Sequence, residues 1–220
     1  MIIAIDGPAG AGKSTIARRL AEELGFQLID TGAMFRTVAY HSVKAGIELD
    51  DAEAVSELAR GLVFEFRFEN GQNVVYCNES ALSDEIRSAD VSRAASVVSA
   101  HPAVRQVLLE QQREVGRKHS SVLEGRDIGT VVFPDAELKI FLTASPVIRA
   151  ERRVEQMREQ GQDADYDQVL ADIIERDRRD SEREIAPLRR AGDAREIDST
   201  AASIESIVAE ILETARSLTK

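Results

Sequence analysis

The chain has 220 residues, of which 43% are hydrophobic, so it can bury one sizeable core with a smaller appended lobe. Aromatic residues make up only 5% and tryptophan is absent, which leaves isoleucine, valine, leucine and alanine to form that core, a mixture that suits a parallel sheet covered by helices. The net charge of −11 argues against a duplex nucleic-acid binder, whose surface is usually basic, but it does not exclude a small anionic ligand.

The first part of the chain follows the rhythm of a strand, a loop and a helix. Residues 2–6 form a short apolar run typical of a buried strand, and a glycine-rich turn separates it from a helix with Ile16, Leu20 and Leu24 on one face. Gly25 is expected to end that helix. A second strand is predicted at residues 26–29, and further helices at 31–43 and 50–60.

The next segment interrupts this rhythm. Residues 62–68 alternate between apolar and charged side chains, the pattern of a half-buried antiparallel strand. Asn70-Gly71 is a hairpin turn signal, and residues 73–77 supply the partner strand. We therefore expect residues 61–90 to form an inserted lobe with antiparallel strands.

Helices and strands alternate again in the second half. The expected helices are 91–118 with a break near His101-Pro102, 146–160, 165–183 and 201–218, and the expected strands are 121–123, 138–142 and 195–198. Residues 125–129 are predicted to be a loop at the carboxyl end of a strand, the edge where open α/β sheets bind ligands.

Three general properties complete the expectations. Cys77 is the only cysteine, which excludes an internal disulfide and fits a reducing compartment. No apolar run approaches the ~20 residues that a membrane span needs, and the N-terminus does not resemble a signal peptide. We expect a soluble, cytoplasmic monomer that binds neither a membrane nor polymeric nucleic acid.

The strongest motif follows the first strand. It reads Gly7-Pro8-Ala9-Gly10-Ala11-Gly12-Lys13-Ser14 and matches the phosphate-binding loop pattern at every fixed position. Glycines let backbone N–H groups approach phosphates, and the helix that follows points its positive dipole end at them. Lys13 can reach the β- and γ-phosphates of ATP, and Ser14 can ligate Mg²⁺. With Thr15, these residues are the predicted ATP site.

Three further blocks accompany this loop. They are Asp30-Thr31-Gly32-Ala33-Met34-Phe35-Arg36, the run from Glu124 to Asp135 that contains Gly-Arg-Asp-Ile-Gly-Thr-Val-Val-Phe-Pro-Asp, and Arg176 to Arg183 followed by Ala186-Pro187-Leu188. Together with the loop, the blocks closely resemble bacterial cytidylate kinases over nearly the whole chain. The resemblance implies a single kinase domain over residues 1–220, an α/β fold of the P-loop NTPase type. Its three layers would enclose a central parallel sheet, with a nucleoside-monophosphate-binding lobe at 61–90 and a lid at 146–163.

The resemblance also implies a reaction: transfer of the γ-phosphoryl group of ATP to CMP or dCMP. By this resemblance Thr31, Arg36, Arg126 and Arg183 hold the acceptor phosphate, Ser96, Arg105 and Asp127 read the cytosine, and Arg176 and Asp180 contact the ribose. The predicted catalytic residues are Lys13, Arg126, Arg153 and Arg183. The family often has serine where this chain has Thr31 and tyrosine where it has Phe35, so one contact at each position stays open.

The physical chemistry agrees with these roles. Two nucleotides are both anionic, so arginines must surround the phosphates if they are to meet in line. Cytosine offers a donor amine that a carboxylate such as Asp127 can accept, whereas uracil presents a carbonyl that the carboxylate would repel. Arg176 and Asp180 are also spaced to form an ordinary ion pair within one helix.

Other interpretations stay open. Arg149, Arg152, Arg153 and Arg158 fit a mobile lid that closes on ATP, but with the glutamates between them they also fit a solvated helix. The chain could instead be another P-loop kinase that acts on an alcohol, which would require a general base. It could also be an ATP-binding module without catalysis, which the full arginine set disfavours.

Overall fold

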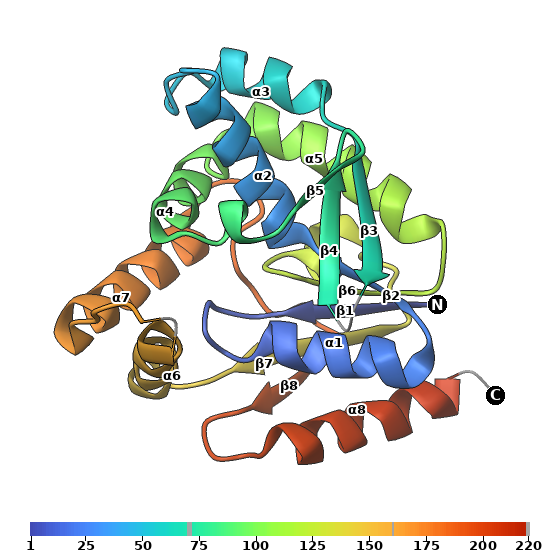
Figure 1. Ribbon diagram of the computed structural model, residues 1–220. Coiled ribbons are helices and arrows are strands. Elements are labelled where there is room, and N and C mark those ends of the chain that lie inside the picture. The colour runs from blue at the N-terminus through green and yellow to red at the C-terminus, as the bar shows by residue number, and fades with distance from the viewer. Residues whose placement is uncertain (70–71, 160, 219–220) are drawn as a thin grey trace.

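The computed structural model describes residues 1–69, 72–159 and 161–218, so the predicted Asn70-Gly71 turn lies outside the described residues (Figure 1). Its centre is a five-stranded parallel sheet in the order β2-β6-β1-β7-β8. The strands are β1 (Ile2–Asp6), β2 (Gln27–Asp30), β6 (Ser121–Gly125), β7 (Leu138–Thr143) and β8 (Arg195–Asp198). The predicted parallel sheet is confirmed.

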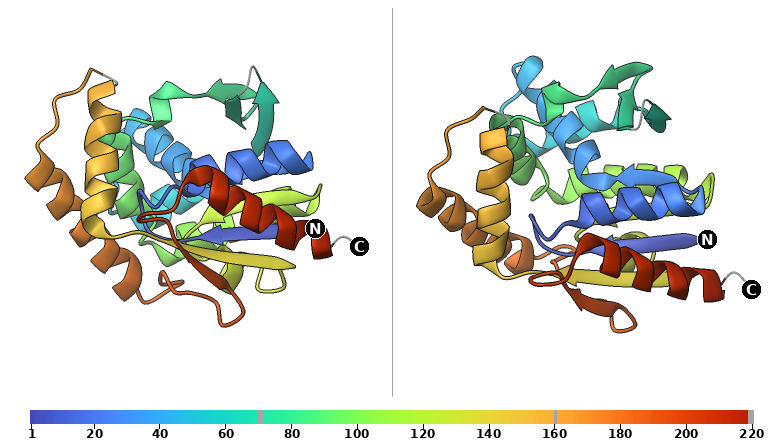
Figure 2. Two further views of the ribbon diagram at one scale, coloured as in Figure 1. Left: turned by 90° about the horizontal axis from the view of Figure 1, so that it is seen from below. Right: turned by 60° about the horizontal axis from the view of Figure 1, so that its bottom comes forward.

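Helices cover both faces of this sheet and make the three predicted layers (Figure 2). On one face lie α1 (Lys13–Leu24) and α8 (Ile204–Leu218). On the other lie α2 (Thr31–Lys44), α3 (Ala52–Arg60), α4 (Ala89–Val98) and α5 (Pro102–Arg117). Residues of β1 alternate between the two cores, with Ile3 and Ile5 on the α1 side and Ala4 on the α2 side.

Local chemistry explains where several helices begin and end. The Asp30 side chain accepts from the N–H of Ala33 and caps α2. Gly25 ends α1 with a φ of 66°, a left-handed conformation that favours glycine. Pro102 occupies the first turn of α5, so the predicted break between α4 and α5 is confirmed.

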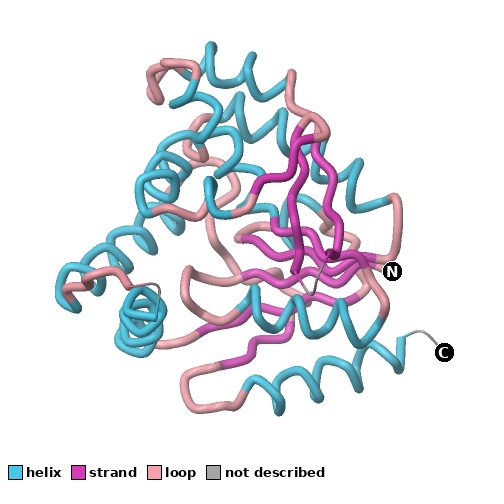
Figure 3. Tube along the Cα trace, in the orientation of Figure 1, coloured by secondary structure: helices cyan, strands magenta, loops and turns pink. Residues whose placement is uncertain are grey.

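The inserted lobe is a second, antiparallel sheet in the order β3-β4-β5 (Figure 3). It contains β3 (Phe64–Glu69), β4 (Gln72–Cys77) and β5 (Ser80–Leu82), followed by the short helix η1 (Asp84–Ile86). Phe64 and Phe66 are buried in the same cluster as Met34 and Val38 of α2. The lobe therefore shares a core with the helices beside the main sheet.

Three short elements were not predicted, and one of them is the helix η1. The strand β5 has only three residues, too short for a pattern of alternation. Residues 128–132 form a turn of π-helix, η2 (Ile128–Val132), where the sequence indicated a plain loop. Tertiary contacts hold this turn, because Arg113 of α5 donates to the carbonyl oxygens of Val131 and Val132 at 2.8 and 2.9 Å.

The helices α6 (Pro146–Glu159) and α7 (Tyr166–Glu182) pack against each other beyond the carboxyl ends of the strands (Figure 1). They include the described part of the predicted lid. Within the described residues no helix is long and apolar enough to span a membrane.

The core around α5 supports a stability prediction. Leu108 is fully buried, whereas Leu218, also in a helix, is 52% exposed. We expect Leu108→Ala to lower the free energy of unfolding by about 2–5 kcal/mol, because it removes buried apolar atoms and leaves a cavity. Urea unfolding followed by circular dichroism measures the loss. Leu218→Ala is the matched control, and an equal loss in both variants would contradict the assigned core.

Candidate active site

The glycine-rich loop joins the end of β1 to the start of α1. Gly7, Gly10 and Gly12 have φ values of 147°, 77° and 90°, which side chains disfavour. A Cβ at Gly7 would lie 2.0 Å from the carbonyl oxygen of Leu142 on β7, so glycine is required for this close approach. The loop turns from the sheet directly into α1, an arrangement that offers backbone N–H groups and a helix N-terminus to a phosphate.

Lys13 and Ser14 begin α1 and lie beside the end of β6. The buried Lys13 donates from Nζ to the carbonyl oxygen of Pro8 at 2.8 Å. Burial lowers the pKa of Lys13 to about 7, and the positive charge of Arg126 contributes. The Ser14 hydroxyl donates to Oε2 of Glu124 at 2.8 Å, and burial raises the pKa of Glu124 to about 7. The amine of Lys13, the hydroxyl of Ser14 and the carboxyl group of Glu124 thus lie where the start of α1 adjoins the end of β6.

Carboxylates hold three of the arginines predicted to contact the acceptor, and two of these acids, Asp127 and Asp180, are buried. The pairs are Arg36 with Asp30 (2.7 Å), Arg105 with Asp127 (2.6 Å) and Arg126 with Asp180 (2.9 Å). Arg183 lies between two of these acids, 3.6 Å from Asp127 and 3.8 Å from Asp180. The paired residues come from the end of β2, from α2, α5 and α7, and from the segment after β6, so the fold brings distant blocks of sequence together at one edge of the sheet.

Several donors in this cluster are unsatisfied. Among the described residues, Nε of Arg36, Nε of Arg176 and Nη2 of Arg183 are buried and have no hydrogen-bond partner. Buried polar groups are normally paired, and an unpaired charged donor is costly. Three such donors from three arginines indicate a site that an anion completes.

Arg176 lies close enough to the other cations to be affected by them. Burial, together with the charges of Arg126 and Arg36, lowers its pKa to about 10. The alternative of an ion pair within α7 is not what the structure shows: Asp180 pairs with Arg126, and no ion pair between Asp180 and Arg176 occurs in the described part of the chain.

Arg105 is held on three sides. Besides Asp127, its guanidinium donates to the carbonyl oxygen of Ser99 at 3.3 Å and lies 5.3 Å from the centroid of the Phe35 ring. This contact needs only an aromatic face, which phenylalanine supplies as well as tyrosine. Thr31, the other departure from the family pattern, donates its hydroxyl proton to the carbonyl oxygen of Glu124 at 2.7 Å. Because this proton is already donated, the Thr31 hydroxyl can serve a ligand only as a hydrogen-bond acceptor.

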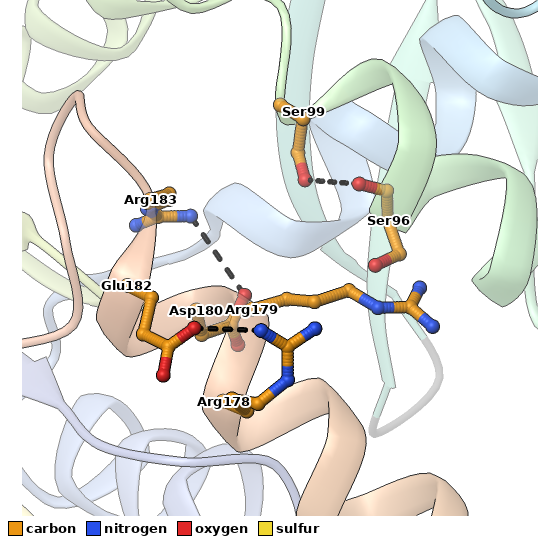
Figure 4. A pocket seen from close by; sticks show the side chains of 8 residues that line it. Ser96, Ser99, Arg178, Arg179, Asp180, Glu182 and Arg183 are labelled. Atoms are coloured by element: carbon orange, nitrogen blue, oxygen red, sulfur yellow. Dashed lines mark hydrogen bonds and ion pairs between the residues drawn. The ribbon is translucent and has the colours of Figure 1, made fainter.

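A cleft of about 330 Å³ opens between α4 and α7 (Figure 4). Ser96 lines one side, and Asp180 and Arg183 line the other. Arg179 also lines the cleft, and its guanidinium donates to Glu175 of its own helix at 2.8 Å. Of the predicted base-reading and ribose-contacting residues, Ser96 and Asp180 therefore border one space, whereas Arg105, Asp127 and Arg176 are not among its lining residues.

The lid arginines have different environments. Arg153 donates to Gln156 on its own helix at 2.8 Å, so the structure does not bring it to the phosphate loop. Arg149 is buried and donates to the carbonyl oxygen of Ala9 in that loop and, with both terminal nitrogens, to Asp177 of α7. Arg149 therefore fastens the base of α6 to the loop and to α7.

Three groups at this site were not predicted from the sequence: Glu124, the pair of Arg149 with Asp177, and Asp6, whose carboxylate accepts from two backbone N–H groups of the segment after β6. Asp6 is the last residue of β1 and Glu124 the next to last of β6, and this position at the ligand-binding edge of the sheet is a signal that could have identified both. No group of three or more acidic, histidine or cysteine side chains that could hold a metal is found in residues 1–69, 72–159 and 161–218. The hydrogen-bonded pair of Ser14 and Glu124 offers two oxygen-bearing side chains at the start of α1.

Comparison with known proteins identifies the family. A family model described as cytidylate kinase matches residues 3–217. The chain belongs to the cytidylate kinase family. A cytidylate kinase of Citrifermentans bemidjiense is 47% identical, with 97% of this chain and 91% of the relative covered. One of Bacillus pumilus is 45% identical, with 97% and 95% covered.

Solved structures agree with the family at the level of fold. A shikimate kinase of Bacteroides thetaiotaomicron has a TM-score of 0.51 and 17% identity, with 98% of both chains covered. An uncharacterised protein of Eubacterium ventriosum has a TM-score of 0.56 and 14% identity, with 99% of both chains covered. Cytidylate kinases thus share their α/β architecture with other small kinases, and the expected fold class is confirmed.

The buried pair at the base of α6 gives a prediction. Arg149→Met should lower the free energy of unfolding by about 3 kcal/mol, because it leaves Asp177 and a loop carbonyl oxygen without their partner. Arg18→Met is the control, since Arg18 and Glu22 form an exposed pair that contributes less than about 1 kcal/mol. Urea unfolding of both variants provides the measurement. Equal stability of the two variants would show that the Arg149 pair is not a structural fastening.

Proposed function

We propose that the chain transfers the γ-phosphoryl group of ATP to CMP or dCMP, which gives ADP and CDP or dCDP. Family membership supports this reaction, because curated relatives at 44–47% identity over at least 96% of this chain are cytidylate kinases. The observation that carries the proposal is the group of unsatisfied, buried arginine donors, one of which belongs to Arg176, whose charge helps to lower the pKa of Lys13. A kinase that joins two anions requires such donors, whereas an alcohol kinase requires a general base.

On the donor side, the loop from Gly7 to Thr15 binds ATP. Lys13, whose pKa is lowered when no nucleotide is bound, regains a full positive charge beside the phosphates and moves from Pro8 to the β- and γ-oxygens. The loop N–H groups and the start of α1 share the remaining charge.

On the acceptor side, the arginines hold the monophosphate in line with ATP. Arg36, Arg126 and Arg183 offer guanidinium donors to its oxygens, and Thr31 borders the same space. Asp127 accepts from the exocyclic amine of cytosine while Arg105, fixed by Asp127 and Phe35, donates to a ring acceptor. Ser96 assists at the base, and Arg176 and Asp180 contact the sugar.

A divalent metal, Mg²⁺ in this proposal, would be held by Ser14, by ATP oxygens and, on its outer side, by Glu124. The donor set fits this ion, because Mg²⁺ in kinases keeps several waters and uses only one or two protein ligands. When bound, the ion neutralises charge on the β- and γ-phosphates. Glu124 orients the Ser14 hydroxyl through the 2.8 Å hydrogen bond.

The lid and the assembly state belong to the same proposal. Residues 146–163 close over ATP, and Arg153 joins the phosphates only in that closed state. The enzyme works as a monomer in the cytoplasm on small nucleotides, without a polymeric nucleic acid or a membrane. The acidic surface, with a net charge of −11, agrees with this set of partners.

A panel of acceptors tests the reaction. With ATP and Mg²⁺, we expect ADP release with CMP and dCMP at rates at least about 100-fold above those with UMP, because the Asp127 carboxylate repels the uracil carbonyl. AMP and GMP should be inactive, and a coupled spectrophotometric assay follows ADP. ADP release only with an alcohol acceptor, or with none, would contradict the proposed reaction.

Asp127→Ala separates acceptor reading from donor binding. We expect kcat/KM for CMP to fall by about 100-fold or more, with the Kd for ATP within about threefold, because in the proposed complex the carboxylate contacts the acceptor and not ATP. Steady-state kinetics and calorimetric titration measure the two. Asp135→Ala, an exposed acid of the same block, is the matched control. An equal loss of ATP binding and CMP turnover in Asp127→Ala would show that the base-reading role is misplaced.

A further inference from the structure

Asp6 is a buried carboxylate that takes no part in the proposed binding of ATP or CMP. It ends β1 and immediately precedes Gly7, the first residue of the phosphate loop. Its Oδ1 accepts from the N–H of Ile128 at 2.8 Å and its Oδ2 from the N–H of Gly129 at 2.7 Å. Each carboxylate oxygen thus accepts one backbone hydrogen bond, from a residue more than 120 positions away in the sequence.

The two N–H groups that Asp6 binds adjoin the acceptor-reading residues. Ile128 directly follows Asp127, and Asp127 directly follows Arg126. The opposite end of the π-helical turn is held independently by Arg113. The turn is therefore clamped at both ends, and only the Asp6 end connects to the phosphate loop.

We propose that Asp6 is a positioning residue that sets the distance and orientation of Arg126 and Asp127 relative to the phosphate loop. It touches neither nucleotide and acts through the backbone of residues 128 and 129. This role rests on the proposed function, because it concerns how the same donor and acceptor sites are held in register.

Two further observations support the role. Burial raises the pKa of Asp6 to about 6, and nearby Asp127 adds to the rise, so an ionised carboxylate at this position is kept at an energetic cost. Gly129 lets the backbone come close: an added Cβ would lie 3.4 Å from Oδ2 of Asp6 and 3.1 Å from Cδ of Lys139. Lys139 cannot withdraw easily, because its ammonium group is fixed by the carbonyl oxygen of Pro134 and by Asp193.

Asp6→Asn tests the proposal with almost no change of shape. An asparagine has one acceptor oxygen and one NH₂ group, so one of the two backbone N–H groups would face another donor. We expect the ratio of kcat/KM for CMP to that for UMP to fall by about tenfold, because Asp127 is displaced, while the Kd for ATP stays within about threefold. A merely structural role would lower the melting temperature without changing this ratio.

Glu137→Gln is the matched control, since Glu137 accepts from the N–H of Ile2 at the other end of β1 and is far from the loop. It should leave the CMP-to-UMP ratio unchanged. Gly129→Ala supplies the same test if Asp6→Asn does not fold, because its Cβ would press against the Lys139 side chain and shift the turn without altering charge. An unchanged ratio in the folded variant, or an equal loss of ATP binding and CMP turnover, would overturn the proposal.

Hydrogen exchange distinguishes this proposal from the proposed function. In Asp6→Asn the amides of Ile128 and Gly129 should exchange at least about tenfold faster than in the wild type, with the amides of β7 unchanged. If wild-type enzyme fails to phosphorylate CMP, the proposed function fails, and faster exchange would still support the clamp. Unchanged exchange at both amides would overturn the clamp, whatever the enzyme phosphorylates.

Discussion

The site depends on buried carboxylates that keep guanidinium groups together when no phosphate is present. Two like charges about 6 Å apart repel by about 3 kcal/mol at an effective dielectric constant of about 20. The lowered pKa values of Lys13 and Arg176 are signs of this repulsion and of burial. Asp127, Asp180 and Asp30 lie among the cations and offset part of the cost.

The acids serve two purposes at once. They hold the arginines in defined orientations, which lowers the entropy lost when a nucleotide binds, and they leave specific donors unsatisfied. Asp127 has a third role in the proposed reaction, since its carboxylate would also accept a hydrogen bond from the amine of the base. The net charge of −11 therefore conceals a local excess of positive charge at one edge of the sheet.

Three contacts fasten the phosphate loop to the parts of the molecule that are proposed to bind the acceptor. Ser14 donates to Glu124 beside the Gly-Arg-Asp segment, Arg149 joins the loop carbonyl of Ala9 to α7, and Asp6 holds the turn after Asp127. In-line transfer tolerates little displacement of one phosphate relative to the other. Rigid fastening of the two halves satisfies this requirement.

Much of the fold and part of the site could be predicted, because the signals are local. Apolar runs and helical periodicity indicated every strand of the main sheet and every long helix, and the motif around Lys13 required a strand before it and a helix after it. The turn at 128–132 could not be predicted, since no periodic pattern marks it and its bonds come from Asp6 and Arg113. The burial of Arg149 could not be predicted for a similar reason. The sequence pattern of a basic helix is the same whether its arginines are solvated or pair with an acid from another helix.

By itself the sequence determined the phosphate loop, the parallel α/β architecture, the presence of an inserted antiparallel lobe and the arginine-rich blocks. All of these follow from the spacing of neighbouring residues. Only the tertiary structure decided which acid holds which arginine: Asp180 pairs with Arg126, 54 residues away, and not with Arg176 on its own helix. That choice depends on strand order and on how α7 meets the edge of the sheet, because an ion pair forms between groups that packing brings together, whatever their separation along the chain.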